Sequence, residues 1–236
     1  RINKEISKEE ILLDENELSK GKKTFDLAGF EITHDNKIMS YGVDEDGNEK
    51  YILKIFDIET KKELEHTFPE LLYCDYFWYK NKFIFYTIGD DANRIYQVWR
   101  YNFKEKVHTK LFEIMDKLYS VGISMSEDKK YFFITSSSYD TSDIYYFTLK
   151  DDTIKHFTKK VDGMLYSVDH HENTFFIVTN KDNSKNFKIM KTSIDQTSED
   201  NWVDFIPYDN SKFIKGLVML KNFLLVLYKE NGDSFI

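Results

Sequence analysis

The nearest match to a hydrolase nucleophile in this sequence is Ser124, within the segment Gly122-Ile123-Ser124-Met125-Ser126. A nucleophile elbow needs Gly-x-Ser-x-Gly on a sharp turn from a strand into a helix, because that turn exposes the hydroxyl group. Here Ser126 stands where the second glycine is required, and no helical pattern follows. We therefore expect no catalytic residue within this chain.

Three other side chains are candidates for facing a channel or a substrate, namely Asp169, His170 and Arg100. Asp169 and His170 are adjacent, and they either form a hydrogen-bonded pair that fixes the end of an inner strand or present a polar group to the channel. Arg100 is either a channel charge or an exposed residue beside a core tryptophan. His170 and His171 would point to opposite faces of a strand, which disfavours a shared metal ion. We expect neither a metal nor a cofactor.

Composition limits the class of protein that must position these residues. The chain has 236 residues, of which 41% are hydrophobic and 17% aromatic, enough for a substantial core. The net charge of −8 disfavours nucleic acid as a partner, because no basic stripe could neutralise phosphates. No apolar run approaches the length of a membrane span. Cys74 is the single cysteine, which fits a reducing compartment and predicts a cytoplasmic protein.

Short apolar runs separated by Asn, Asp and Lys-Asn turns repeat along the chain and predict strands of antiparallel meanders. The first turn of successive units recurs at intervals of 45, 48, 44 and 48 residues. Four short strands in a period of this length are typical of β-propeller blades, whereas a β-sandwich would not explain the regular period. The fold class is therefore predicted as all-β, a β-propeller of four-stranded antiparallel blades. After a lead-in segment of residues 1–25, we expect a partial propeller over 26–236, with blades near 26–70, 71–116, 117–161, 162–208 and 213–236.

About four and a half blades are present, which is too few to close well. Because the chain also starts without methionine and ends inside an expected strand, we expect it to be a segment of a longer protein. Small residues in the expected first strands, such as Gly29, Gly122 and Gly216, would suit crowding near the axis of a propeller.

Motifs along nearly the whole chain resemble those of the oligopeptidase B group in the prolyl oligopeptidase family of serine peptidases. The resemblance rests on their order and spacing, since each motif alone is weak. Tyr101 replaces the histidine of the family's Val-Trp-Arg-His strand. The matching segments are Glu10–Asp14, Leu27–Lys37, Gln97–Tyr101, Ser136–Asp143, Tyr166–His170, Lys185–Phe187, Asn201-Trp202 and Ile206-Pro207.

This resemblance implies a seven-bladed propeller that caps an α/β-hydrolase domain of the same parent chain. Such enzymes cut short peptides after Arg or Lys, and their propeller keeps folded proteins from the active site. The family's catalytic Ser, Asp and His belong to the hydrolase domain, which we expect to be absent from this chain. The alternative is a non-catalytic propeller that serves as a protein-interaction module. A propeller with its own glycosidase site would need a pair of converging carboxylates, and the sequence does not pair them.

Overall fold

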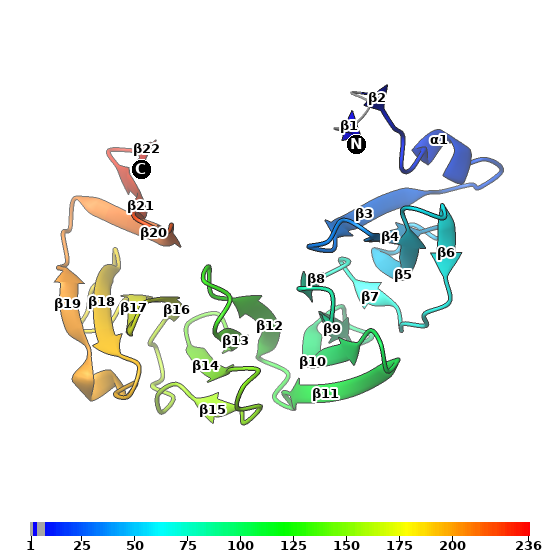
Figure 1. The fold of residues 1–236 in the computed structure, drawn as a ribbon. Coiled ribbons are helices and arrows are strands. Elements are labelled where there is room, and N and C mark those ends of the chain that lie inside the picture. Colours follow the sequence, from blue (N-terminus) through cyan, green and yellow to red (C-terminus); the bar gives the residue numbers. More distant parts are fainter. Residues whose placement is uncertain (1, 4–7) are drawn as a thin grey trace. The chain divides into compact units, whose positions relative to one another are not determined.

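The computed structural model describes residues 2–3 and 8–236, and β-strands dominate it (Figure 1). The chain divides into two compact units, residues 1–113 and 114–236. Helical structure is confined, among the described residues, to a single turn in the first unit and a 3₁₀ turn in the second. These are α1 (Glu15–Leu18) and η1 (Glu199–Asn201).

The first unit contains a five-stranded and a four-stranded antiparallel sheet, preceded by a small hairpin. The hairpin pairs β1 (Ile2–Asn3) with β2 (Lys8–Glu9). The sheets consist of β3 (Asp26–Ile32), β4 (Ile38–Asp44), β5 (Lys50–Asp57) and β6 (Lys62–Leu64), with β7 (Leu71–Leu72) also paired to β5, and of β8 (Tyr76–Tyr79), β9 (Phe83–Gly89), β10 (Ile95–Asn102) and β11 (Val107–Glu113).

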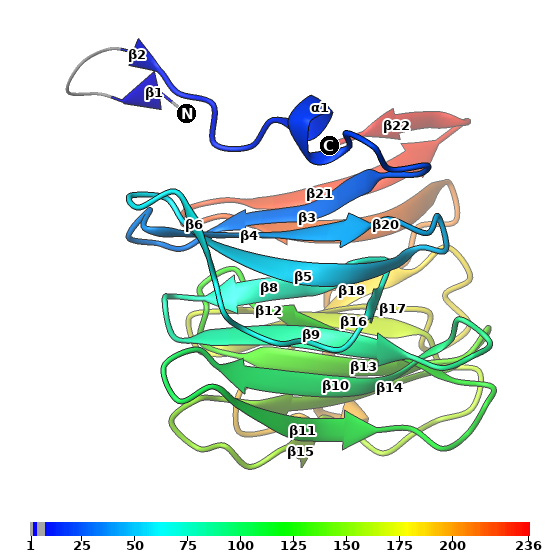
Figure 2. The same cartoon turned by 90° about the vertical axis from the view of Figure 1, so that its right-hand side faces the viewer.

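The second unit contains two further four-stranded sheets and one three-stranded sheet, all with neighbours in sequence order. Figure 2 shows their strands running side by side, so that their turns lie at two opposite ends. The strands are β12 (Ser120–Met125), β13 (Phe132–Ser137), β14 (Ser142–Phe147) and β15 (Lys155–His156); β16 (Tyr166–His171), β17 (Thr174–Thr179), β18 (Lys188–Ser193) and β19 (Val203–Ile206); and β20 (Lys212–Met219), β21 (Leu224–Glu230) and β22 (Asp233–Phe235).

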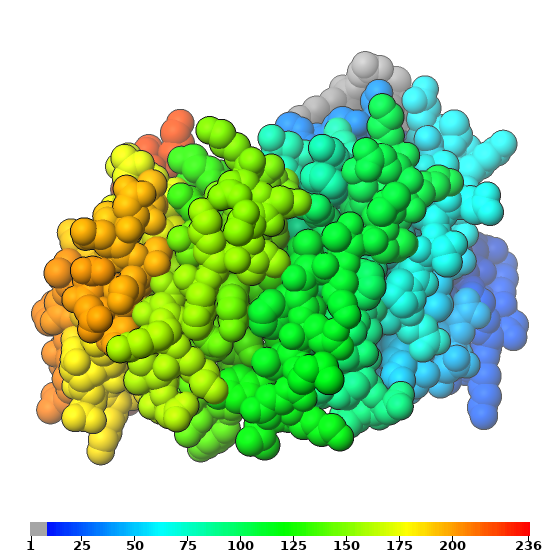
Figure 3. All heavy atoms as spheres, turned by 90° about the horizontal axis from the view of Figure 1, so that it is seen from below, coloured from blue at the N-terminus to red at the C-terminus, as the bar shows by residue number. Residues whose placement is uncertain are grey.

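These sheets confirm the predicted fold class of repeated four-stranded antiparallel meanders. The near-continuous apolar runs are explained by burial on both faces, since the first five residues of β9 are all buried. In the second unit, aromatic side chains from β12–β15 and β16–β19 pack between the two sheets, as Phe157 does against Phe175 with ring centroids 5.1 Å apart. The space-filling view shows these segments, green to orange, in contact in chain order (Figure 3).

Tyrosines at the start of a first strand hold neighbouring sheets together. Tyr166 begins β16, its hydroxyl accepts a hydrogen bond from the backbone N–H of Ile144 at 3.1 Å, and its own N–H donates to Ser142 Oγ at 3.2 Å. In the first unit, Tyr76 begins β8 and its hydroxyl donates to the carbonyl of Gly29. Where one sheet meets the next, which we call a seam, these backbone groups are therefore hydrogen-bonded to side chains of the neighbouring sheet rather than within their own sheet.

The crowding predicted for small residues of the first strands is present at only some positions. A Cβ atom at Gly29 would lie 2.4 Å from Cys74 Sγ, whereas no described atom would lie within 4 Å of a Cβ at Gly122 or Gly216. The prediction is wrong for these two glycines, since a Cβ at either position would meet no described neighbour. Crowding in the first unit instead comes from Cys74, which lies between β7 and β8 and fills the gap above Gly29 and Gly42.

We expect Gly42→Ala to destabilise the protein by about 1–3 kcal/mol, because overpacking a close contact forces local shifts. The new Cβ would lie 2.2 Å from Cys74 Sγ and 3.0 Å from Tyr51 Cβ. Urea unfolding would measure the change, with Gly122→Ala as the matched control in open space. Adding Cys74→Ala should recover part of the loss, and strictly additive effects of the two substitutions would contradict the proposed clash.

We expect Tyr166→Phe to cost about 1–3 kcal/mol, because it leaves the buried N–H of Ile144 without its acceptor. The matched control is Tyr145→Phe in the neighbouring sheet, where the hydroxyl donates to Asp143 at a partly exposed position. Thermal or urea unfolding of both variants tests the difference. Equal stability of the two variants would show that the hydroxyl of Tyr166 does not support the seam.

Candidate functional site: a cavity between three hairpin turns

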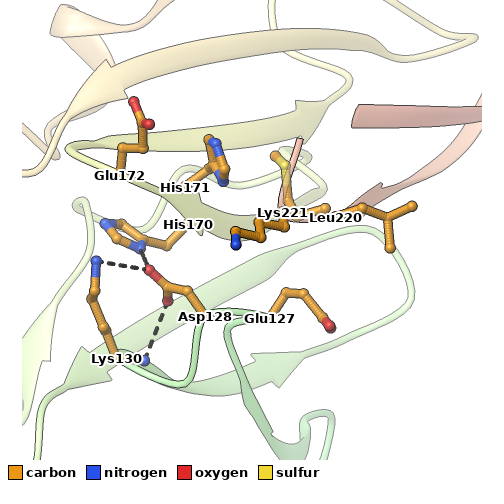
Figure 4. Close-up of a pocket in the computed structure, with 9 residues that line it drawn as sticks. Glu127, Asp128, Lys130, His170, His171, Glu172, Leu220 and Lys221 are labelled. Atoms are coloured by element: carbon orange, nitrogen blue, oxygen red, sulfur yellow. Dashed lines mark hydrogen bonds and ion pairs between the residues drawn. The ribbon is translucent and has the colours of Figure 1, made fainter. Parts of the chain in front are cut away.

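A cavity of about 320 Å³ lies where the first hairpin turns of three successive sheets come together in the second unit (Figure 4). This volume is at the lower end of the range for small-molecule sites in proteins. The turns are β12–β13, β16–β17 and β20–β21, and the cavity contains the predicted candidate His170. Its lining residues are Glu127, Asp128, Lys130, His170, His171, Glu172, Met219, Leu220 and Lys221.

The β12–β13 turn is built around Ser126 and Asp128. The Ser126 hydroxyl donates to Asp128 Oδ1 at 2.8 Å and accepts from the N–H of Tyr131 at 3.0 Å, so the side chains close the turn in place of backbone groups. The turn after β3 repeats this arrangement, because Thr33 Oγ1 donates to Asp35 Oδ1 at 2.8 Å. A Ser/Thr-x-Asp-x-Lys pattern therefore encodes the position of the carboxylate locally.

His170 reaches this turn from the neighbouring sheet. Its side chain is only 1% exposed, and its Nδ1 lies 2.9 Å from Asp128 Oδ2. A carboxylate can only accept, so Nδ1 carries the hydrogen and Nε2 is left as an acceptor. Nε2 is buried and has no hydrogen-bond partner among the described residues. The ring packs against Tyr131 at 4.4 Å and Phe175 at 5.4 Å between centroids.

The electrostatics of the contact favour a neutral histidine beside a charged aspartate. Burial lowers the pKa of His170, and the attraction of Asp128 only partly opposes this effect. Burial also works to raise the pKa of Asp128, but hydrogen bonds from Ser126 and Lys130 outweigh it and hold that pKa below its ordinary value. Lys130 Nζ lies 3.2 Å from Asp128 Oδ2 and places a cation beside this carboxylate.

The arrangement of Asp128 and His170 resembles the orienting half of an acid–base couple, in which a carboxylate fixes the tautomer of a histidine. A nucleophile is missing from it, since no serine or cysteine is among the described lining residues. No group of three or more potential metal ligands occurs in the part of the chain that the structure describes. The contact between Asp128 and His170 therefore joins two sheets. It also places a polar pair in a cavity whose other lining residues include both positive and negative charges.

Asp169 faces a second, smaller cavity of about 220 Å³ beside the inner strands β12, β16 and β20. Its Oδ1 accepts a hydrogen bond from the backbone N–H of His170 at 2.7 Å. Burial raises the pKa of Asp169, and the nearby carboxylates of Glu127 and Asp128 act in the same direction. The adjacent pair is thus linked through the backbone, while the imidazole of His170 pairs with Asp128 instead.

Arg100 belongs to the first unit and lies on β10, the third strand of its sheet. Its guanidinium carbon lies 4.9 Å above the ring centroid of Phe83 on the adjacent strand. This position stabilises the sheet surface through a cation–π contact. The structure brings Asp169 and His170 together on β16, whereas Arg100 is not among the residues that line their two cavities. That any of the three faces substrate stays a prediction.

Sequence reasoning missed Asp128, the partner of His170. The sequence signal that could have identified Asp128 is the match between Ser126-x-Asp128-x-Lys130 and Thr33-x-Asp35-x-Lys37. This pattern indicates a carboxylate held by its own turn at the end of a first strand. The contact with His170 spans 42 residues of chain and depends on how the sheets pack. A local pattern therefore identifies the carboxylate but not the histidine that it holds.

We expect the protein to lose stability as pH falls below about 6.5, the ordinary pKa of histidine. Because the folded pKa of His170 is lowered, the unfolded chain binds more protons in this window, and stability rises with pH across it. His66 and His108 have lowered pKa values through burial and contribute similarly. Comparing the pH dependence of stability in wild type and in His170→Gln isolates the contribution of His170.

Melting temperatures measured from pH 8 to pH 5 provide the test. The acid-induced decrease should be smaller in His170→Gln than in wild type, by up to about 1.4 kcal/mol per pH unit for the one lost group. The charge of Lys130 also lowers the pKa of His170, so Lys130→Met serves as a control that keeps the titrating ring. Identical pH profiles for wild type and His170→Gln would contradict the assignment of a buried neutral histidine.

Comparison with known proteins assigns the fold to a family. The model of the prolyl oligopeptidase N-terminal β-propeller domain matches residues 1–236. Protease 2 of Moraxella lacunata is 28% identical over 230 residues, which are 95% of this chain and 33% of that protein. Dipeptidyl aminopeptidase BI of Pseudoxanthomonas mexicana is 25% identical over 240 residues, which cover 95% of this chain and 32% of that protein.

Solved structures support the same assignment. Oligopeptidase B from Leishmania major superposes with a TM-score of 0.89 at 21% identity, covering 98% of this chain and 33% of that chain. Oligopeptidase B from Trypanosoma brucei, with covalently bound antipain in a closed form, gives a TM-score of 0.82 at 26% identity, covering 95% and 32%. The chain spans about a third of the length of the relatives that it matches. It belongs to the prolyl oligopeptidase family, as an N-terminal β-propeller region.

Proposed function

We propose that this chain is the substrate-gating β-propeller part of a serine-type oligopeptidase that cleaves short peptides after Arg or Lys. The observation that carries the proposal is the family match over residues 1–236, in a chain that covers about a third of relatives named as peptidases. The motifs shared with oligopeptidase B favour that group within the family. In this proposal, residues 1–25 lead into a propeller over 26–236, and the remaining blades and the catalytic domain belong to the same polypeptide.

Gating follows from the construction of the propeller. Its sheets pack through aromatic cores and are tied by hydrogen bonds at their seams, so each blade is a rigid wall. A channel enclosed by such rigid blades admits an extended peptide and excludes a folded protein. The excess of acidic residues, with a net charge of −8, would attract cationic peptides. Asp169 and the rim of the His170 cavity are the polar groups that we assign to the substrate side.

Other features of the chain fit this proposal. Neither helix of the described residues has the length or apolar composition needed for a membrane span. The single cysteine, Cys74, is buried, and burial raises the pKa of its thiol to about 12, which makes it inert. We place the parent enzyme in the cytoplasm, where an unpaired cysteine is ordinary.

The full-length protein should hydrolyse a short fluorogenic peptide that ends in Arg-Arg, and a serine-reactive inhibitor should abolish the activity. A peptide of equal length with Glu in place of the last Arg is the matched control, and a folded protein rich in surface arginines should remain uncut. The rate constant kcat/KM for the basic peptide should fall as salt rises, because screening weakens long-range attraction. An inactive full-length protein would support the interaction-module alternative instead.

A further inference from the structure

We propose that residues 65–70 form a strap that closes the joint between the first two sheets and is released when His66 and His108 become protonated. The strap is the connection between β6, at the edge of the first sheet, and β7 (Figure 1). It reaches β10 and β11 of the second sheet, where it meets Tyr101 and His108. Regulation by pH through this strap goes beyond the proposed function.

Side chains rather than a backbone ladder hold the strap in place. Among the described residues, no backbone-to-backbone hydrogen bond involves residues 65–70. Instead, Lys106 Nζ donates to the carbonyl of Glu65 at 2.8 Å, and His108 Nε2 donates to the carbonyl of Thr67 at 3.0 Å. A segment with so few backbone hydrogen bonds can open locally without unfolding the sheets on either side of it.

Phe68 anchors the strap in the aromatic core of the second sheet. Its side chain is only 7% exposed. Its ring centroid lies 4.7 Å from that of Tyr101, 5.4 Å from that of His108 and 5.8 Å from that of Tyr86, each in an edge-to-face arrangement that aromatic pairs favour. Opening of the strap would expose Phe68 to water and remove this contact between the two sheets.

The strap holds His108 in a single tautomer. The carbonyl of Thr67 can only accept, so Nε2 carries the hydrogen and Nδ1 of the neutral ring is an acceptor. The hydroxyl of Tyr86 lies 2.9 Å from Nδ1 and donates to it. Because Tyr86 is only 1% exposed, protonation of Nδ1 would set two donors against each other at a site that water does not reach.

His66, on the strap itself, makes a similar contact with Tyr101. Its Nδ1 lies 2.6 Å from the buried hydroxyl of Tyr101, and its ring stacks on Phe103 with centroids 4.5 Å apart. Burial raises the pKa of Tyr101, so this hydroxyl keeps its hydrogen and donates it to neutral His66. Protonation of His66 would reverse the hydrogen bond and create a charge that Lys106 repels.

The surroundings of both rings favour their neutral forms. Burial lowers the pKa of both histidines, and the charge of Lys106 lowers that of His66 further. The hydrogen bond to Thr67 opposes burial at His108 but does not outweigh it. No carboxylate of the described residues is among the groups that shift either pKa. The groups that face the two rings are Phe68, Tyr86, Tyr101, Phe103 and Lys106, with the carbonyl of Thr67.

The direction of the response follows from this preference for neutral histidines. The open strap binds more protons than the closed strap, because an exposed histidine has an ordinary pKa of about 6.5. Closure is therefore favoured above this pH and is lost as the pH falls below it. From about pH 7.5 to about pH 5.5, the equilibrium constant for opening should rise by up to about tenfold for one histidine and about a hundredfold for both.

Hydroxyl-radical footprinting of the full-length protein at these two pH values tests the strap, since opening exposes Phe68. We expect the modification rate of Phe68 to rise at least about tenfold at the lower pH. The rate at Phe147, a buried residue of the second unit, should stay within about twofold. Equal rates for Phe68 at the two pH values, or parallel increases at Phe68 and Phe147, would overturn the proposal.

Variants identify the groups that respond to pH. Combining His66→Gln with His108→Gln keeps amide groups for hydrogen bonding but removes the titration, so the response of Phe68 should disappear, and each single variant should keep about a tenfold response. His156→Gln is the matched control with an intact response, because His156 also stacks on an aromatic ring, that of Tyr145, but at a more exposed position. A response that persists in the double variant, or that disappears in His156→Gln, would overturn the assignment.

A second measurement links the strap to gating and rests on the proposed function. The ratio of kcat/KM for a long unstructured basic peptide to kcat/KM for a short one cancels the titration of the catalytic groups. We expect this ratio to rise severalfold at the lower pH in wild type and to stay constant in the double variant. A constant ratio in an active wild-type enzyme whose Phe68 becomes exposed would overturn the role in gating. A protein without peptidase activity whose Phe68 still responds to pH would reject the proposed function and leave the strap standing.

Discussion

The second strands of the four successive larger sheets, β4, β9, β13 and β17, are mostly buried on both faces, and the rest of the structure depends on covering those faces. A four-stranded meander of this kind cannot bury its side chains alone, so it must pack against a neighbour. Phe157 and Phe175 show the result, since they come from successive sheets and meet edge to face in one core. Aromatic residues suit this packing because a flat ring fills the space between two pleated surfaces.

Close packing of sheets leaves backbone groups at their seams without water, and those groups must find partners across the seam. Tyr166 supplies one such partner to Ile144, and Tyr76 makes an equivalent contact in the first unit. Both tyrosines begin the first strand of a sheet, which is where that strand meets its predecessor. A tyrosine hydroxyl thus serves the same place in two pairs of successive sheets, as a donor in one and as an acceptor in the other.

The candidate cavity is a further consequence of sheet packing. Asp128 is held by its own turn, and His170 reaches it from the next sheet. This contact stabilises the seam and leaves a buried imidazole nitrogen without a partner. The opposite end of the same unit has different chemistry, with apolar projections from Leu118 and Tyr139 beside a polar hollow. The same antiparallel sheets thus present two distinct surfaces, because successive turns of a meander lie at opposite ends of the sheet.

The sequence by itself determined the all-β class, the four-stranded repeat and the family, because apolar runs, Asn/Asp turns and ordered motifs are local signals. It also identified Asp169 and His170 as polar residues on an inner strand. Tertiary structure alone decided that His170 pairs with Asp128, that Gly122 is uncrowded while Gly42 lies against Cys74, and that Arg100 packs on Phe83. These outcomes depend on contacts between sheets or on side-chain rotamers, and no pattern within one strand carries that information.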